Sequence, residues 1–289
     1  MFAKINRIND VEPYKVLEYE NYMPNLKDSK VIKNIAQNFQ KAEAHDVMFD
    51  SDDLQWLYGF AYSRCHTVRH NDNGTVFISG NLQTIYKNFK DKIDAIIPGA
   101  GNSPVVGGNF FITPSQYGLH NDSTREKDWQ DTLKDTPLNS DRRRFVPWRN
   151  VIIPIYTCLP GIESHGVFFD QRHIDFAHVY HHGRKPDQKV ATTYPLVDDH
   201  KDIDFHLLDG TKQDKEKNLL PYNENHFDRY LYYTPKRRLT GLTPELTCKW
   251  EVGKPIVFDA VQLHATNKGL KERQWNTKMG LLLTFLREM

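Results

Sequence analysis

The sequence predicts an α+β protein whose core is a β-sandwich or jelly roll. Two patterns lead to this fold class: helical spacing of apolar residues in the first third of the chain, and short apolar runs bounded by Gly, Pro and polar clusters thereafter. At 289 residues, one domain with elaborations is ordinary for such a fold, with two domains as the alternative. We expect residues 1–98 to form a helical or mixed N-terminal support and residues 99–289 to form the core.

The N-terminal third contains one amphipathic stretch and one aromatic stretch. Residues 29–44 place Val31, Ile35 and Phe39 at near-helical spacing behind Ser29, a candidate N-cap, and so predict a helix. Residues 54–78 are aromatic and β-branched and are divided by the turn-forming letters HNDNG. This pattern predicts strands joined by a hairpin or a tight loop.

The clearest helix pattern covers residues 81–96. Leu82, Ile85, Phe89, Ile93 and Ile96 would share one face, Asn81 would be the N-cap, and Pro98 followed by Gly99 would end the helix. Beyond it, five apolar or alternating runs predict strands. They are VVGGNFFIT, NVIIPIYTCL, HGVFFDQ, KPIVFDAVQLHA and KMGLLLTFLRE.

The stretch from about residue 174 to residue 250 is polar and rich in turn formers, with little sustained periodicity. We interpret it as a long insertion before the last core strands that covers the barrel or its mouth. Structureless segments of this length are more often functional than idle.

Composition narrows the class of function. Lys and Arg number 38 against 37 Asp and Glu, so no strong field favours nucleic acid or a membrane as a partner. Three cysteines without paired spacing argue against a disulfide framework and for a reducing compartment. Because no run reaches the length of about 20 apolar residues that crosses a bilayer, and no apolar leader opens the chain, we expect a cytoplasmic protein.

The pattern His-x-Asp occurs five times, and context separates the copies. Identical His-Asn-Asp triplets stand at 70–72 and 120–122. The first lies within HNDNG, where turn chemistry accounts for it. The copies beginning at His200 and His226 fall in the polar stretch and are interpreted as surface or loop histidines. The copy at His173 follows a strand-like run, but its spacing suits a solvated or lid segment as well as a metal site.

The second triplet has features of a metal site. His120 and Asp122 follow an apolar strand that breaks at Pro114, and ligands at a strand end are held on a rigid platform. His264 ends a later apolar strand and is the candidate third ligand. Lys278, 14 residues further, opens the last strand and could pair with an anionic cosubstrate.

Together, His120-x-Asp122, the distal His264 in VFDAVQLHATNKG and the basic residue opening KMGLLLTF resemble the Fe(II)- and 2-oxoglutarate-dependent dioxygenases. The resemblance covers residues 105–125 and 252–287. It extends loosely to both the phytanoyl-hydroxylase and the prolyl-hydroxylase branches and does not distinguish between them. It implies a double-stranded β-helix, a cupin-like jelly roll. It also implies that His120, Asp122 and His264 hold Fe(II) and leave positions open for 2-oxoglutarate and O2.

The resemblance further implies a cation for the far carboxylate of 2-oxoglutarate. Lys278 matches by its place in the strand, and Arg273 is the runner-up. Tyr117 is similar to an aromatic hydroxyl that many members place beside the cosubstrate, with a core tyrosine as the alternative. The carboxylate Asp122 favours hydroxylation over halogenation, while desaturation and ring formation stay open.

The predicted activity is therefore hydroxylation of a C–H bond in a small molecule or a macromolecular side chain. Substrate contacts are expected from the aromatic segment around Trp56 and Tyr62, from Trp148 and Arg149, and from the 174–250 stretch. Two alternatives remain: a cupin-like metalloenzyme without 2-oxoglutarate, in which Lys278 reaches the surface, and a non-catalytic jelly-roll binding protein. Neither the substrate nor the oligomeric state follows from the sequence.

Overall fold

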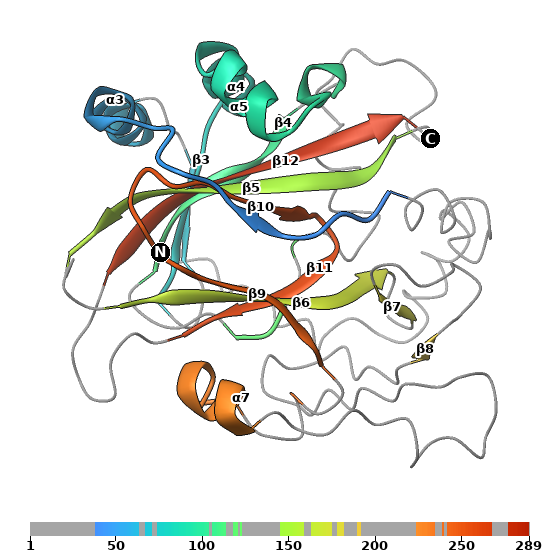
Figure 1. The fold of residues 1–289 in the computed structure, drawn as a ribbon. Helices are drawn as coiled ribbons and strands as arrows, with labels where there is room; N and C mark the ends of the chain where they lie inside the picture. The colour runs from blue at the N-terminus through green and yellow to red at the C-terminus, as the bar shows by residue number, and fades with distance from the viewer. Residues whose placement is uncertain are drawn as a thin grey trace, which may run out of the picture.

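The computed structural model describes two facing β-sheets with helices on their outer sides (Figure 1). The described residues are 38–63, 67–70, 74–103, 106–113, 118–120, 122, 145–158, 163–174, 178–181, 190–191, 224–234, 239, 242–267 and 277–288. Among them, no helix has both the length and the apolar character needed to span a membrane.

The larger sheet has seven strands in the order β1-β10-β5-β12-β4-β3-β2, and every pairing is antiparallel. Its longest members, β5 and β12, lie side by side at the centre. The strands are β1 (Glu43–Ala44), β2 (Thr67–His70), β3 (Val76–Ser79), β4 (Val106–Thr113), β5 (Phe145–Thr157), β10 (Ile256–Asp259) and β12 (Lys278–Glu288).

The register of β5 against β12 is irregular at two places, and both involve a proline. Gly280 is opposite Pro154 and Leu286 is opposite Pro147, each beside a shift in register. A proline has no N–H to donate to a strand ladder, so bulges accommodate the two prolines inside a central strand.

The smaller sheet faces the larger one and is also antiparallel. Its order is β11-β6-β7-β8, and β9 also pairs with β6. The strands are β6 (His165–Ile174), β7 (His178–His181), β8 (Val190–Ala191), β9 (Pro244–Lys249) and β11 (Gln262–Thr266).

Side chains alternate between the two faces of each sheet, as the period of two requires. On β6, Phe168 points into the space between the sheets, while Val167 and Phe169 pack against α7 (Glu224–Tyr230) on the outer side. On β11, His264 lies between the outward Leu263 and Ala265. This alternation directs a polar residue of an apolar strand into the inter-sheet space.

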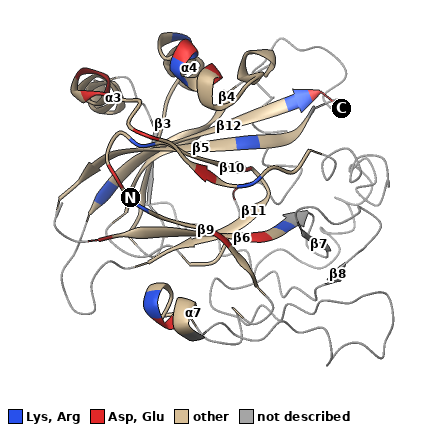
Figure 2. Cartoon of the chain, viewed as in Figure 1, with Lys and Arg blue, Asp and Glu red and all other residues tan. Residues whose placement is uncertain are grey.

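The outer face of the larger sheet is covered by α3 (Ser51–Ser63), α4 (Leu82–Asn88) and α5 (Lys90–Ile96), followed by the short 3-10 helix η2 (Ala100–Asn102) (Figure 1). Leu281, Leu283 and Phe285 of β12 pack in this outer core. Acidic and basic residues occur together on α5 and α7 (Figure 2), in line with the small net charge of the chain.

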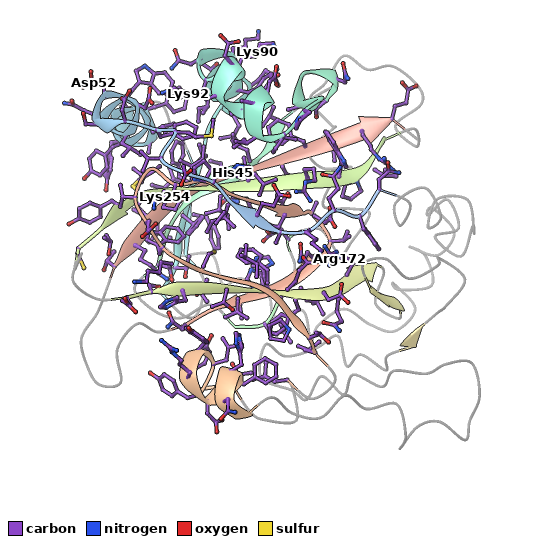
Figure 3. All side chains as sticks on the ribbon, viewed as in Figure 1. His45, Asp52, Lys90, Lys92, Arg172 and Lys254 are labelled. Carbon is purple, nitrogen blue, oxygen red and sulfur yellow. The ribbon has the colours of Figure 1, made fainter. Side chains whose placement is uncertain are left out.

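A buried ion-pair network joins the two sheets. Asp259 of β10 binds Arg149 of β5 (Oδ1 to Nη1, 2.7 Å) and Arg172 of β6 (Oδ2 to Nε, 2.9 Å). Arg172, labelled in Figure 3, has no exposed surface and also pairs with Glu245 of β9. The backbone N–H of Gln40 donates to Asp259 at 3.0 Å, so the network also anchors the segment before β1.

The strand interpretation of residues 54–63 is wrong, because α3 occupies them. Asp50 caps this helix by accepting the N–H groups of Asp52 and Asp53, and Asp53 accepts the N–H of Asp50 in return. This is a reciprocal capping box built from two aspartates. Leu57 and Phe60 lie on its buried face. The predicted hairpin further along is confirmed as β2 and β3.

The helix predicted over 81–96 is confirmed as two consecutive helices that meet at Phe89. Its predicted apolar face is buried, and the side chain of Asn81 accepts the N–H of Thr84 at 3.3 Å as the predicted N-cap. The helix predicted over 29–44 is wrong at its end, where Glu43 and Ala44 form β1. Residues 29–37 lie outside the described residues.

Two further expectations about the second half need correction. The run KPIVFDAVQLHA forms two strands, β10 and β11, that belong to different sheets, with Ala260 and Val261 at the turn. Part of the stretch 174–250 is regular structure, since it contains β7, β8, α7 and the core strand β9. The N-terminal third also contributes β1, β2 and β3 to the larger sheet.

Candidate metal centre

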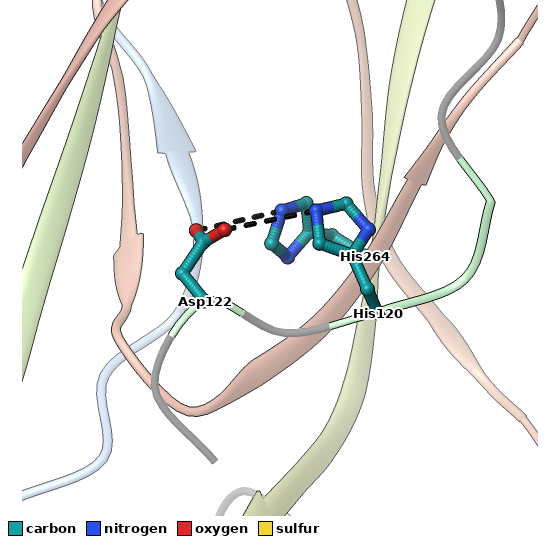
Figure 4. Close-up of side chains that lie close together, drawn as sticks. All are labelled: His120, Asp122 and His264. Carbon is teal, nitrogen blue, oxygen red and sulfur yellow. Dashed lines mark ion pairs between the residues drawn. The ribbon is translucent and has the colours of Figure 1, made fainter. Parts of the chain in front are cut away.

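Two histidines from distant parts of the sequence are joined through their backbones. The N–H of His120 donates to the carbonyl of His264 at 3.0 Å, and the N–H of His264 donates to the carbonyl of His120 at 2.8 Å. This isolated antiparallel bridge sets the two imidazole rings side by side, with centroids 4.2 Å apart. Asp122 follows two residues after His120, and its carboxylate lies against both rings (Figure 4).

Hydrogen bonds determine which nitrogen of each ring faces the carboxylate. Nδ1 of His120 lies 2.7 Å from the carbonyl of Gly118, and Nδ1 of His264 lies 2.9 Å from the carbonyl of Gln262. A carbonyl oxygen only accepts, so both Nδ1 atoms carry the proton and both Nε2 atoms present a lone pair when the rings are neutral. Metal-binding histidines are held in this way.

Three potential ligand atoms therefore converge. Nε2 of His120 is 3.6 Å from Oδ1 of Asp122, and Nε2 of His264 is 3.6 Å from Oδ2. One ligand atom from each residue lies within 4.8 Å of the other two. Two imidazole nitrogens and one carboxylate that share one point could hold a divalent metal ion, and this ligand set is typical of non-heme iron(II) sites.

The protonation of the group also suits a cation. Burial, followed by the proximity of His264, holds the pKa of His120 well below its ordinary value, which favours the neutral, metal-binding ring. Burial raises the pKa of Asp122, although His264 and a hydrogen bond from Asn150 oppose the rise. A bound divalent cation would stabilise the ionised carboxylate that burial disfavours.

Aromatic side chains hold the deeper ring in place. The ring of Phe168 stacks on His264 at a centroid distance of 5.5 Å, and Phe258 lies 4.8 Å from it at an angle. The His264 side chain is 4% exposed, whereas that of His120 is 27% exposed. The group is therefore more deeply buried on the His264 side than on the His120 side.

Lys278 is a buried cation without a carboxylate partner among the described residues. Its Nζ donates to Oγ of Ser164 at 2.6 Å and lies 5.2 Å from the ring centre of Trp250. Burial lowers the pKa of Lys278 to about 8. Within the same described portion of the chain, Nε1 of Trp250 is also a buried donor without an acceptor. These donors would suit an anion.

The other candidate cofactor residues and the histidines excluded as ligands have different outcomes. Arg273 and Tyr117 lie outside the described residues, so their roles stay predictions. His70 ends β2 with its backbone opposite Val76, beside the predicted turn. His226, interpreted as a surface or loop histidine, lies in the helix α7 and not in a loop, with Nε2 3.0 Å from Oγ1 of Thr247.

The residues predicted to contact the substrate lie on α3 and β5, and that role stays a prediction. Trp56 and Tyr62 belong to α3 on the outer face of the larger sheet (Figure 1), and Trp148 packs against the outer core. Arg149 is buried in its ion pair with Asp259.

Sequence reasoning missed three residues, of which one supports the converging group and two contact Lys278. Asn150 donates to Oδ2 of Asp122 at 2.9 Å, and Ser164 and Trp250 surround the Lys278 ammonium. Asn150 could have been noticed as a lone amide at the head of the apolar run NVIIPIY. Ser164 and Trp250 carry no comparable local pattern.

No protein-family model and no curated protein matches the chain. Solved structures do match. The non-heme alpha ketoglutarate dependent epimerase SnoN is 8% identical at a TM-score of 0.43, over 90% of this chain and 84% of that one. The non-heme alpha ketoglutarate dependent carbocyclase SnoK is 9% identical at a TM-score of 0.43, over 91% of this chain and 85% of that one. A Pseudomonas putida prolyl-4-hydroxylase is 10% identical at 0.39, over 90% and 99%. Since these TM-scores are below 0.5, the case for a function rests on the geometry of the site.

Proposed function

We propose that this chain is an Fe(II)- and 2-oxoglutarate-dependent oxygenase built on a double-stranded β-helix. One observation carries the proposal: Nε2 of His120, Nε2 of His264 and the carboxylate of Asp122 face one point, with both Nδ1–H groups donated to backbone carbonyls. Two histidines and one carboxylate on one side of a metal leave its remaining positions for other ligands. The three residues fit iron(II) in ligand type and in number.

Each ligand residue has a defined task. His120 and His264 supply neutral imidazole nitrogens at a spacing that their backbone bridge sets. Asp122 supplies the negative charge. When bound, iron and 2-oxoglutarate supply the oxidising chemistry that uses O2 and releases succinate and CO2. Phe168 and Phe258 exclude water from the ring of His264, while the side of His120 stays accessible.

Lys278 is the residue proposed to bind the far carboxylate of 2-oxoglutarate. A buried ammonium without a counter-ion is unfavourable, and a charge-assisted hydrogen bond to a carboxylate would contribute ~1.5 to 3 kcal/mol. The hydroxyl of Ser164 is already within hydrogen-bond distance of the ammonium, and the indole N–H of Trp250 is a further donor in the same inter-sheet region. Arg273 remains the alternative cation.

Hydroxylation of a C–H bond is the proposed reaction, because Asp122 supplies the carboxylate whose replacement in similar halogenases admits halide. The proposed substrate is a small molecule or a macromolecular side chain that enters on the His120 side. O2 is the proposed co-substrate.

Titration calorimetry under anaerobic conditions tests the proposal. We expect the wild-type protein to bind 2-oxoglutarate when Fe(II) is present and Lys278→Ala to lose that binding while it still binds the metal. Unchanged 2-oxoglutarate binding by Lys278→Ala would favour Arg273 as the cation. A wild-type protein that binds Fe(II) but no 2-oxoglutarate would favour a cupin-like enzyme that does not use this cosubstrate. A folded wild-type protein that binds no Fe(II), Mn(II) or Ni(II) would instead favour a non-catalytic jelly-roll protein.

A further inference from the structure

Asn150 is a fully buried amide with one hydrogen-bond partner among the described residues. It has no exposed surface and lies within β5, opposite Phe258 on one side and Thr284 on the other. Its Nδ2 donates to Oδ2 of Asp122 at 2.9 Å. Its Oδ1 is buried and accepts no hydrogen bond from the described part of the protein.

The fold alone gives no reason for an amide at this position. Asn is a poor strand former, and a buried carbonyl oxygen without a donor is unfavourable by roughly 1 to 3 kcal/mol. The next residues of the strand, Val151 and Ile152, are apolar and pack in the outer core and the inter-sheet core respectively. An apolar residue at 150 would satisfy the same packing, so the contact with Asp122 is what distinguishes the amide.

The direction of the amide follows from its neighbour. If the group were reversed, Oδ1 would face the carboxylate, and two acceptors would repel each other. The orientation with Nδ2 toward Asp122 is therefore preferred even though it leaves Oδ1 without a partner. The amide then holds Oδ2 of Asp122, and Oδ1 of Asp122 keeps all of its lone pairs for a metal ion.

We propose that Asn150 is a positioning residue that holds the Asp122 carboxylate in its metal-binding orientation. The inference rests on the proposed function, because it takes His120, Asp122 and His264 as metal ligands. Asp122 lies outside the strands, so its side chain needs an external support. Outer hydrogen-bond partners of metal ligands commonly contribute about 10- to 100-fold in metal affinity.

Asn109 provides a matched control. It lies on β4, next to the inward-facing Phe111, and its Oδ1 is also buried without a partner among the described residues. No hydrogen bond joins it to Asp122 within that set. Asn109 is half-buried, whereas Asn150 is fully buried. Asn150→Leu and Asn109→Leu both remove an amide whose Oδ1 is buried without a partner among the described residues, but only the first removes support from the carboxylate.

The experiment is calorimetric titration of the full chain with Co(II) alone, with circular dichroism to verify folding. We expect Asn150→Leu to bind Co(II) about 10- to 100-fold more weakly than wild type and Asn109→Leu to bind like wild type. Asn150→Ser, whose hydroxyl is too short to span the same gap, should show the same loss and replaces Asn150→Leu if the latter does not fold.

The outcomes separate this inference from the proposed function. Wild-type affinity in the folded Asn150 variant overturns the role of Asn150 alone, and so does an equal loss in Asn109→Leu. A folded wild-type protein that does not bind Co(II) overturns the proposed metal site and this inference with it.

Discussion

His120 and His264 lie 144 positions apart in the sequence and form a two-way backbone hydrogen-bonded pair, with N–O distances of 3.0 and 2.8 Å. The separation between their rings is thus set by β-bridge geometry and not by flexible side chains. Asp122 reaches the same pair because it follows His120 by two residues. The centre is assembled from a strand-like segment and β11 of the smaller sheet.

The first prediction concerns metal retention. His120→Ala or His264→Ala removes one of three ligand atoms, so we expect either variant to lose bound iron on dialysis where wild type retains it. His45→Ala is the control, because this histidine lies before α3, outside the converging group. Metal analysis of the dialysed proteins gives the answer. Equal iron content in wild type and both ligand variants would contradict the ligand assignment.

The second prediction couples stability to cosubstrate binding. Burial lowers the pKa of Lys278 from 10.5 in the unfolded chain to about 8 in the folded protein. The charged form therefore destabilises the fold below pH 8, and this penalty disappears as the pH rises toward 10.5. At pH 7, Lys278→Met should raise the free energy of unfolding by roughly 1 to 3 kcal/mol and abolish 2-oxoglutarate binding.

Urea denaturation and calorimetry measure the two effects of Lys278→Met. A purely structural lysine would instead give a less stable variant with no change in ligand binding. That pair of results would remove Lys278 from the proposed site.

The third prediction is a pH dependence of cosubstrate affinity. The proposed ligand is the protonated Lys278, whose population falls tenfold for each pH unit above its pKa of about 8. Affinity for 2-oxoglutarate should therefore fall about tenfold between pH 7 and pH 9. In Lys278→Arg the cation stays protonated, so the fall should be absent over the same range. A decline of equal size in both proteins would assign the pH dependence to another group.

The fourth prediction concerns the ion-pair network between the sheets. Asp259→Ala leaves Arg149 without its buried carboxylate and removes one of the carboxylates from Arg172. Removing one partner of a buried ion pair destabilises a protein by about 3 to 5 kcal/mol, and urea denaturation should show a loss of this size. Lys90→Ala, which breaks an exposed i,i+4 pair with Asp94, is the control and should have little effect. Equal midpoints of urea denaturation for the two variants would contradict a stabilising role of the ion-pair network.

Local pattern was sufficient for the strands that lie in the centre of the fold. The runs that became β4, β5, β6 and β12 are long, apolar and bounded by turn residues, and each is confirmed. The same holds for the helical face of residues 81–96. These elements bury one complete face or stripe, so their periodicity is visible in the sequence.

Two other interpretations were wrong, one because a local signal was overlooked and one because the boundary between two strands depends on tertiary structure. The aromatic residues of α3 read as a strand, but the capping box at Asp50 and the buried spacing of Leu57 and Phe60 favour the helix. The turn at Ala260 and Val261 is apolar and buried, so β10 and β11 looked like one strand.

The candidate metal centre was partly predictable, because the surroundings of each triplet are visible in the sequence. The identical triplets at 70–72 and 120–122 differ in their surroundings, and the structure brings His120 and Asp122 to His264. The lone amide of Asn150 is visible in the sequence, but its contact with Asp122 was not predictable, because it spans 28 positions and depends on how β5 faces the segment after β4.

Anaerobic titration of the protein with Fe(II) and 2-oxoglutarate, followed by visible absorption, tests the central claim most directly. We predict a weak charge-transfer band when both are present, and its loss in folded His120→Ala and His264→Ala. The account would be contradicted if the folded wild-type protein, like the variants, developed no such band.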